Sequence, residues 1–122
     1  MQRIQSIRGA IDVTENSIDA ISSATTKLIK EILEKNSIKE DDIVNIMFTI
    51  TDDLDAINPA TVIRKTLNLT TAPMLCSQEM KIQGAMPKVI RTLVQTYTSL
   101  NKNQIKHIYL EKAESLRPDL AG

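Results

Sequence analysis

A thiol, a carboxylate and a guanidinium lie close together between residues 76 and 91. Cys76 and Glu79 belong to the run Leu75-Cys76-Ser77-Gln78-Glu79-Met80, and Arg91 follows a Gly84-Ala85 hinge. These residue types at these spacings match no metal, phosphate-loop or catalytic-triad pattern. A guanidinium and hydrogen-bonding side chains around one turn suit a small anion. The stretch therefore predicts a small-anion site.

Length and composition predict one domain, residues 1–122, with a real hydrophobic core. The chain has 122 residues, of which 42% are hydrophobic. Fifteen basic and fifteen acidic residues cancel, so the charge excess of a general nucleic-acid or membrane-surface binder is missing. The aromatic residues are Phe48, Tyr97 and Tyr109, too few for a base-stacking platform. We expect neither nucleic acid nor a membrane as a partner.

The sequence also predicts a cytoplasmic protein without metal or cofactor. Cys76 is the only cysteine, no apolar run approaches membrane-spanning length, and Met1-Gln2-Arg3 does not begin a signal peptide. The pair Asp52-Asp53 is followed by no histidine or third carboxylate at a useful spacing, which favours a turn over a metal site.

Apolar patterns predict an α/β or α+β fold in which helices cover a mixed sheet. We expect strands at 3–13, 43–50, 72–76 and 106–111, and helices at 18–36, 59–67 and 85–97. The segment from Thr14 to Ser17 offers capping oxygens for the first helix, and Asn58 should cap the second, with Pro59 at its first position. A bulge at Gly9 is expected, and it would re-aim Arg8 toward a cleft, but the strand pattern alone favours an exposed strand arginine at this position.

Two of these elements bear directly on the site. The helix at 85–97 would start near Pro87, carry Arg91 and turn four side chains inward, Val89, Leu93, Val94 and Tyr97. In the last strand, Tyr109 shares one face with His107 and Glu111, which predicts a polar pocket lip.

Several separated blocks resemble the monofunctional, AroH-class chorismate mutases over almost the full chain. These blocks are Ile7-Arg8-Gly9-Ala10, Asn58-Pro59-Ala60 with Arg64, Cys76 to Met80, Ile90-Arg91, Ile108 to Ala113, and Leu116 to Leu120. The resemblance implies a homotrimer of α/β subunits forming a pseudo-barrel, with active sites at the subunit clefts. It also implies conversion of chorismate to prephenate, a step toward phenylalanine and tyrosine.

The implied reaction is a unimolecular rearrangement that needs no nucleophile, acid–base pair, metal or cofactor. By family position, Arg91 would meet the negative charge that grows on the ether oxygen in the transition state. Arg8 would contact a substrate carboxylate and the region of the ring hydroxyl, while Glu79 and Cys76 would bind that hydroxyl. Tyr109 would donate its hydroxyl to a carboxylate.

Other residues complete the implied site. Leu75, Ser77 and Gln78 belong to the ligand-contacting turn, and Arg64 and Arg117 would lie near the entrance. Asn58 and Thr61 stand where better-known members carry an aromatic residue and a lysine, so weaker substrate steering is expected. The chain ends at Gly122, which predicts less complete closure by a tail.

Alternatives remain for single residues and for the whole function. Cys76 also fits a small buried hydrophobe, and Glu79 a carboxylate at the start of a helix. A non-catalytic anion-binding regulatory trimer and a small trimeric deaminase of reactive intermediates are the rival functions. Neither rival explains Arg8, Glu79, Arg91 and Tyr109 together.

Overall fold

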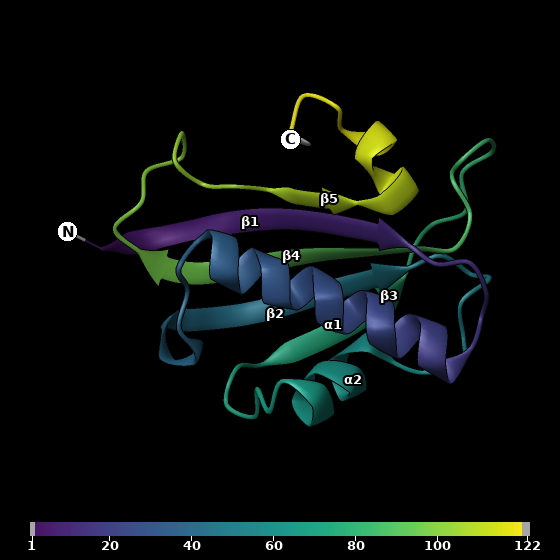
Figure 1. Cartoon of the computed structure of the whole chain (residues 1–122), viewed down its shortest axis with the longest axis horizontal. Coiled ribbons are helices and arrows are strands. Elements are labelled where there is room, and N and C mark those ends of the chain that lie inside the picture. The colour runs from purple at the N-terminus through teal and green to yellow at the C-terminus, as the bar shows by residue number, and fades with distance from the viewer. Residues whose placement is uncertain (1, 121–122) are drawn as a thin grey trace.

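The structure is a computed structural model that describes residues 2–120, a mixed five-stranded sheet with two main helices (Figure 1). The strands are β1 (Arg3–Asp12), β2 (Ile43–Ile50), β3 (Met74–Gln78), β4 (Val89–Thr98) and β5 (Ile108–Leu110). The helices are α1 (Ile18–Lys35) and α2 (Pro59–Thr66). Two 3-10 segments complete the fold, η1 (Glu40–Asp42) before β2 and η2 (Glu111–Leu116) after β5. The predicted α+β class is confirmed.

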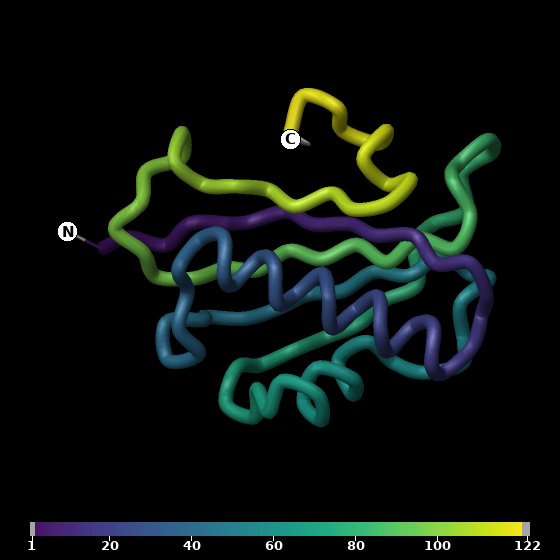
Figure 2. Tube along the Cα trace, in the orientation of Figure 1, coloured from purple at the N-terminus to yellow at the C-terminus, as the bar shows by residue number. Residues whose placement is uncertain are grey.

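The strands lie in the order β3-β2-β4-β1-β5. The central strand β4 runs antiparallel to both neighbours, while β3 and β5 extend the sheet as parallel edge strands. The segment between β3 and β4 rises at the end of the sheet where β5 passes into η2 (Figure 2). Two segments that are separate in sequence, residues 79–88 and 111–116, therefore lie at the same end of the sheet (Figure 2).

Both helices cover the same face of the sheet, and their predicted starts are confirmed. The Ser17 side chain accepts a hydrogen bond from the Ala20 amide at 3.1 Å, and Asn58 accepts one from the Ala60 amide at 2.9 Å. α1 buries an apolar stripe made of Ile21, Leu28, Ile29 and Ile32. This stripe packs on the side chains that β1, β2 and β4 direct toward the helices.

The predicted bulge at Gly9 is wrong. β1 pairs with β4 continuously from Arg3 to Asp12, and the irregularity in the sheet lies on β2, between Ile43 and Asn45. A Cβ atom on Gly9 would lie 2.7 Å from Cδ1 of Ile32. α1 therefore approaches β1 closely at Gly9, where a side chain would have to displace the end of Ile32, and the strand remains regular.

The predicted helix at 85–97 is also wrong, because residues 89–98 form β4. Ile90, Thr92 and Val94 are buried against the helices, in the period of two that a strand requires. Apolar residues on the other face of this central strand produced the helical spacing in the sequence. Tyr97, expected to point inward, is 48% exposed, and Pro87 precedes a strand.

The sheet face opposite α1 and α2, which we call the open face, is only partly covered. Near η2, Ala10, Val89 and Ala113 form a small buried cluster, against which Tyr109 and Leu116 pack. Farther along the same face, Ile4, Met47, Leu75 and Tyr97 are exposed. The open face thus has a sheltered end beside η2 and an exposed apolar remainder.

Candidate active site

One row of residues crosses the open face through all five strands. The strand register aligns Ser77, Thr49, Arg91, Ala10 and Tyr109, in the order β3-β2-β4-β1-β5. Paired residues in neighbouring strands share a face, so these side chains project to the same side. Arg91 and Tyr109, on either side of Ala10 in this row, both line one cleft.

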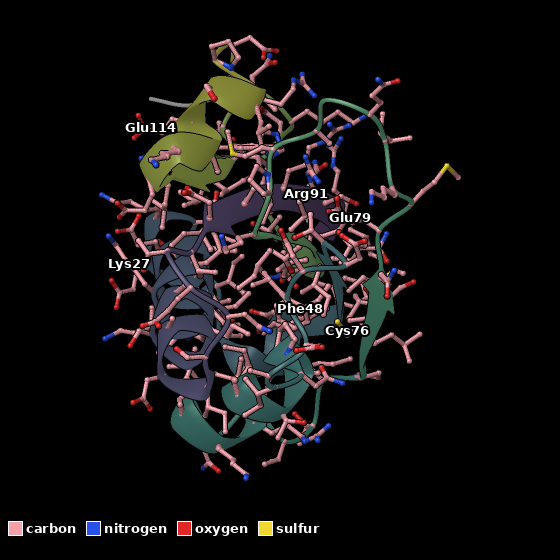
Figure 3. The ribbon with its side chains drawn as sticks, turned by 90° about the vertical axis from the view of Figure 1, so that its right-hand side faces the viewer. Lys27, Phe48, Cys76, Glu79, Arg91 and Glu114 are labelled. Carbon is pink, nitrogen blue, oxygen red and sulfur yellow. The ribbon has the colours of Figure 1, made fainter. Side chains whose placement is uncertain are left out.

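Arg91 is held by an ion pair with Glu79, which directly follows β3 (Figure 3). The Glu79 amide donates to the Ile50 carbonyl at 2.8 Å, and its Oε1 accepts a hydrogen bond from the Thr49 hydroxyl at 2.7 Å. The side chain of Glu79 is 16% exposed and that of Arg91 is 38% exposed. Glu79 is therefore held by its backbone amide and by Thr49, and its carboxylate orients a partly accessible guanidinium.

Beside Arg91 lies a cleft of about 310 Å³ that gathers cationic side chains. Its lining includes Arg8, Arg91, Thr92, Tyr109, Leu116 and Arg117. Three arginines and a phenol around one cleft can bind a ligand that carries two carboxylates, because guanidinium groups match the geometry of carboxylates. The predicted association of Arg8, Arg91, Tyr109 and Arg117 is thus present within one chain.

Arg117 already binds one carboxylate, that of Asp119. Its Nε and Nη2 donate to the two Asp119 oxygens at 3.0 and 2.8 Å. This hydrogen bonding raises the pKa of Arg117 and lowers that of Asp119 from their ordinary values. Both side chains are largely exposed, so we regard the pair as exchangeable with solvent or ligand.

Other predicted site residues lie outside this cleft. The Cys76 side chain packs against the core near Phe48, away from the Arg91–Glu79 pair, and burial raises the pKa of its thiol (Figure 3). Leu75 projects from the edge strand β3 on the open face, where it is 70% exposed. Arg64 lies on α2 and donates to the Thr61 hydroxyl at 3.3 Å.

Ser77 and Gln78 are also exposed on β3. The Ser77 hydroxyl bonds only weakly to the Gln78 carbonyl, at 3.5 Å. Ser77 lies in the same row as Arg91, but Thr49 separates the two residues. Ser77 and Gln78, predicted to lie in a ligand-contacting turn, therefore belong to the edge strand β3 and are exposed.

Two residues without a predicted role contribute to the site. Thr49 bonds Glu79, and His107 accepts a hydrogen bond from the Arg8 amide on Nδ1 at 2.9 Å. Desolvation by burial, followed by repulsion from Arg8 and Arg117, lowers the pKa of His107. Strand alternation places the side chains of Thr49 and Phe48 on opposite faces of the sheet. The contact of Thr49 with Glu79, however, depends on how β2 and β3 pair, which the sequence pattern does not specify.

A larger hollow of about 580 Å³ lies along α1. Its lining mixes the charges of Lys27, Lys30, Glu31 and Glu34 on a solvated helix face. Across residues 2–120, no group of three or more histidine, cysteine or acidic side chains is arranged to hold a metal ion. Within the same range, no helix has the length and apolar character needed to cross a membrane.

Comparisons with known proteins agree on one family. The sequence model described as chorismate mutase type I matches residues 4–120. The chain is 37% identical over 118 residues to chorismate mutase AroH of Bacillus subtilis (strain 168), covering 97% of this chain and 93% of that protein. It is 36% identical over 118 residues to chorismate mutase AroH of Thermus thermophilus, covering 96% of each.

A solved structure, chorismate mutase from Clostridium thermocellum, has a similar fold. It superimposes with a TM-score of 0.88 at 41% sequence identity and covers 91% of this chain and 98% of that chain. The structural similarity therefore extends over most of the chain.

Proposed function

The chain belongs to the chorismate mutase type I family and is a chorismate mutase, and we propose that the cleft between Arg8, Arg91 and Tyr109 is its active site. The reaction is the intramolecular rearrangement of chorismate to prephenate, a step in the biosynthesis of aromatic amino acids. One carbon–oxygen bond breaks while one carbon–carbon bond forms within a single molecule. The atoms balance without a nucleophile, a redox partner or a cofactor, so the protein must bind, orient and polarise its substrate.

The observation that carries this assignment is the fixed guanidinium of Arg91. Negative charge grows on the ether oxygen as the carbon–oxygen bond breaks, and a donor already aimed at that position lowers the barrier. Glu79 holds Arg91, while Thr49 and the Ile50 carbonyl hold Glu79. We assign Arg91 to the ether oxygen, and Glu79 both to orienting Arg91 and to binding the ring hydroxyl.

The remaining cleft residues act on the bound dianion before the barrier is reached. Chorismate must adopt a compact diaxial conformer, which requires anchors at its two carboxylates. Arg8 and Tyr109 lie on neighbouring strands that pair through Gly9 and Ile108, so their spacing is set by the sheet. We assign both residues to the substrate carboxylates, and Arg117 to capture of the dianion at the cleft mouth.

A homotrimer with sites at its subunit interfaces completes the proposal. β3 and α2 lie at the sheet edge opposite β5, which explains why Leu75–Gln78 and Arg64 do not reach the cleft of their own chain. The exposed apolar residues of the open face, including Met47 and Tyr97, supply contact area for a second copy. We propose that residues Leu75–Gln78 of β3, including Cys76, and Arg64 line a neighbouring subunit's cleft.

A chorismate assay tests the function directly. Purified protein in buffer with a chelator should consume chorismate, seen as loss of its diene absorbance, and produce prephenate. Turnover under these conditions would also support the proposed independence from metals and added cofactors. No turnover at high protein concentration would contradict the assignment and favour an anion-binding regulator. We propose a cytoplasmic location, which fits a chain whose single cysteine cannot form an internal disulfide.

A further inference from the structure

The imidazole of His107 adds a side-chain hydrogen bond to the pairing of β1 with β5, one position before the backbone pairing begins. Backbone pairing between these strands begins at Gly9 and Ile108, so His107 occupies the register position opposite Arg8. The Arg8 amide donates to Nδ1 of His107 at 2.9 Å. Because a backbone amide can only donate, Nδ1 must be unprotonated and the ring proton must lie on Nε2.

This contact adjoins two substrate anchors. Arg8 carries the amide in question, and Tyr109 follows His107 by two residues on the same side of β5. β5 pairs with β1 through only three residues, and the Arg8–His107 hydrogen bond adds a fourth point of contact between the two segments. A shift of β5 would move the Tyr109 hydroxyl relative to the Arg8 guanidinium.

We propose that His107 is a positioning residue of this chorismate mutase, whose neutral imidazole holds β5 on β1 and so fixes the spacing of Arg8 and Tyr109. The role rests on the proposed function of the cleft, because it acts through two residues assigned to the substrate carboxylates. His107 itself does not line the cleft, so it is not assigned a contact with chorismate.

The surroundings of His107 favour its neutral form. Arg8 on β1, Arg117 after η2, and Lys102 in the loop before β5 all face this region, and the carboxylate of Asp119 is engaged by Arg117. Burial and the two arginines lower the pKa of His107 from its ordinary value. The contact is therefore intact at neutral pH and is lost as the pH falls through that lowered pKa.

Two substitutions distinguish the loss of the hydrogen-bond acceptor at position 107 from the loss of the imidazole ring. His107→Leu removes the acceptor, whereas His107→Asn keeps an oxygen two bonds from Cβ, as Nδ1 is, and cannot be protonated in this range. We expect His107→Leu to raise KM about 2- to 10-fold at pH 7, with a smaller change in kcat. In wild type we expect KM to rise as the pH falls through the pKa of His107. We expect His107→Asn to restore KM at pH 7 and to abolish that rise. Equal KM values in all three proteins, or equal defects in both variants, would overturn the proposal.

Amide hydrogen exchange tests the same contact without any substrate. In wild type, the protection factor of the Arg8 amide should fall as His107 is protonated, while that of Ile7 stays constant. His107→Asn should keep Arg8 protected at low pH. Arg8 protection that does not respond to protonation of His107 would overturn the proposal, even if a variant fails to fold. Failure of the chorismate assay alone would instead contradict the proposed function, because exchange does not depend on turnover.

Discussion

Arg91 and Glu79 form an ion pair across twelve positions of sequence, one on the central strand β4 and the other at the end of the edge strand β3. The strand β2 lies between them and supplies both the Thr49 hydroxyl and the Ile50 carbonyl that hold Glu79. The orientation of the guanidinium therefore depends on the pairing of three strands. It is fixed before any ligand arrives, which is the arrangement that electrostatic stabilisation of a transition state requires.

Replacing Thr49 by valine should lower kcat by up to about 10-fold. Hydrogen bonds to charged groups are stronger than neutral ones, but Thr49 acts on the reaction only through Glu79 and Arg91. Thr26→Val is the matched control. It also removes a threonine hydroxyl, one that forms an exposed hydrogen bond with the Thr66 hydroxyl between α1 and α2. Steady-state kinetics of both variants should show the loss for Thr49→Val alone. Equal kcat values in both variants would show that Glu79 needs no support from β2.

Local signals in the sequence predicted the starts of both helices. Ser17 and Asn58 cap the two helices, and Pro59 begins α2. Each of these residues acts on the helix next to it, so no knowledge of the rest of the fold was needed. The strand β4 was predicted as a helix because a central strand carries apolar residues on both faces, and Val89, Leu93 and Val94 then mimic helical spacing. Its identity as a strand follows from pairing with β1 and β2, which are distant in sequence.

The site shows the same difference between features that the sequence predicts and features that depend on contacts between distant strands. Arg8, Arg91, Tyr109 and Arg117 were predicted together from the family resemblance, and they line one cleft. The roles of Thr49 and His107 were missed because each depends on a contact between strands. Cys76 packs on the core within its own chain, so its predicted contact with a ligand stays a prediction that concerns the assembled protein.

Gly9→Ala should destabilise the protein by about 1–3 kcal/mol, as overpacking of a well-packed core does. The new methyl group would meet Cδ1 of Ile32 at 2.7 Å, and also Cδ1 of Leu28 at 3.1 Å. Ile32→Val removes the nearer atom, so the double variant should lose less stability than the sum of the single variants. Urea denaturation of the four proteins measures this coupling. Strict additivity would contradict close packing of α1 on Gly9.

The proposed assembly predicts that activity and trimer formation are lost together. Leu75→Glu places a charge on an exposed apolar residue of the open face, so it should dissociate the trimer and reduce activity. Met80→Glu is the control, because Met80 is 81% exposed in the segment beyond β3. Light scattering measures the oligomeric state of each protein, and chorismate assays over a dilution series measure its activity. A fully active wild-type monomer would contradict sites shared between subunits.

The most direct test of the mechanism is the kcat of variants at Arg91. Its proposed role is to meet charge that appears mainly in the transition state, so Arg91→Ala should reduce kcat by at least about 10²–10³-fold. Arg91→Lys should recover only part, since lysine keeps the charge but not the planar donors. Citrulline at position 91 keeps the shape without the charge, and a large loss of kcat with this residue would assign the effect to electrostatics. If Arg91→Ala instead leaves kcat intact and raises KM alone, Arg91 is only a substrate anchor, and the central claim of this mechanism is contradicted.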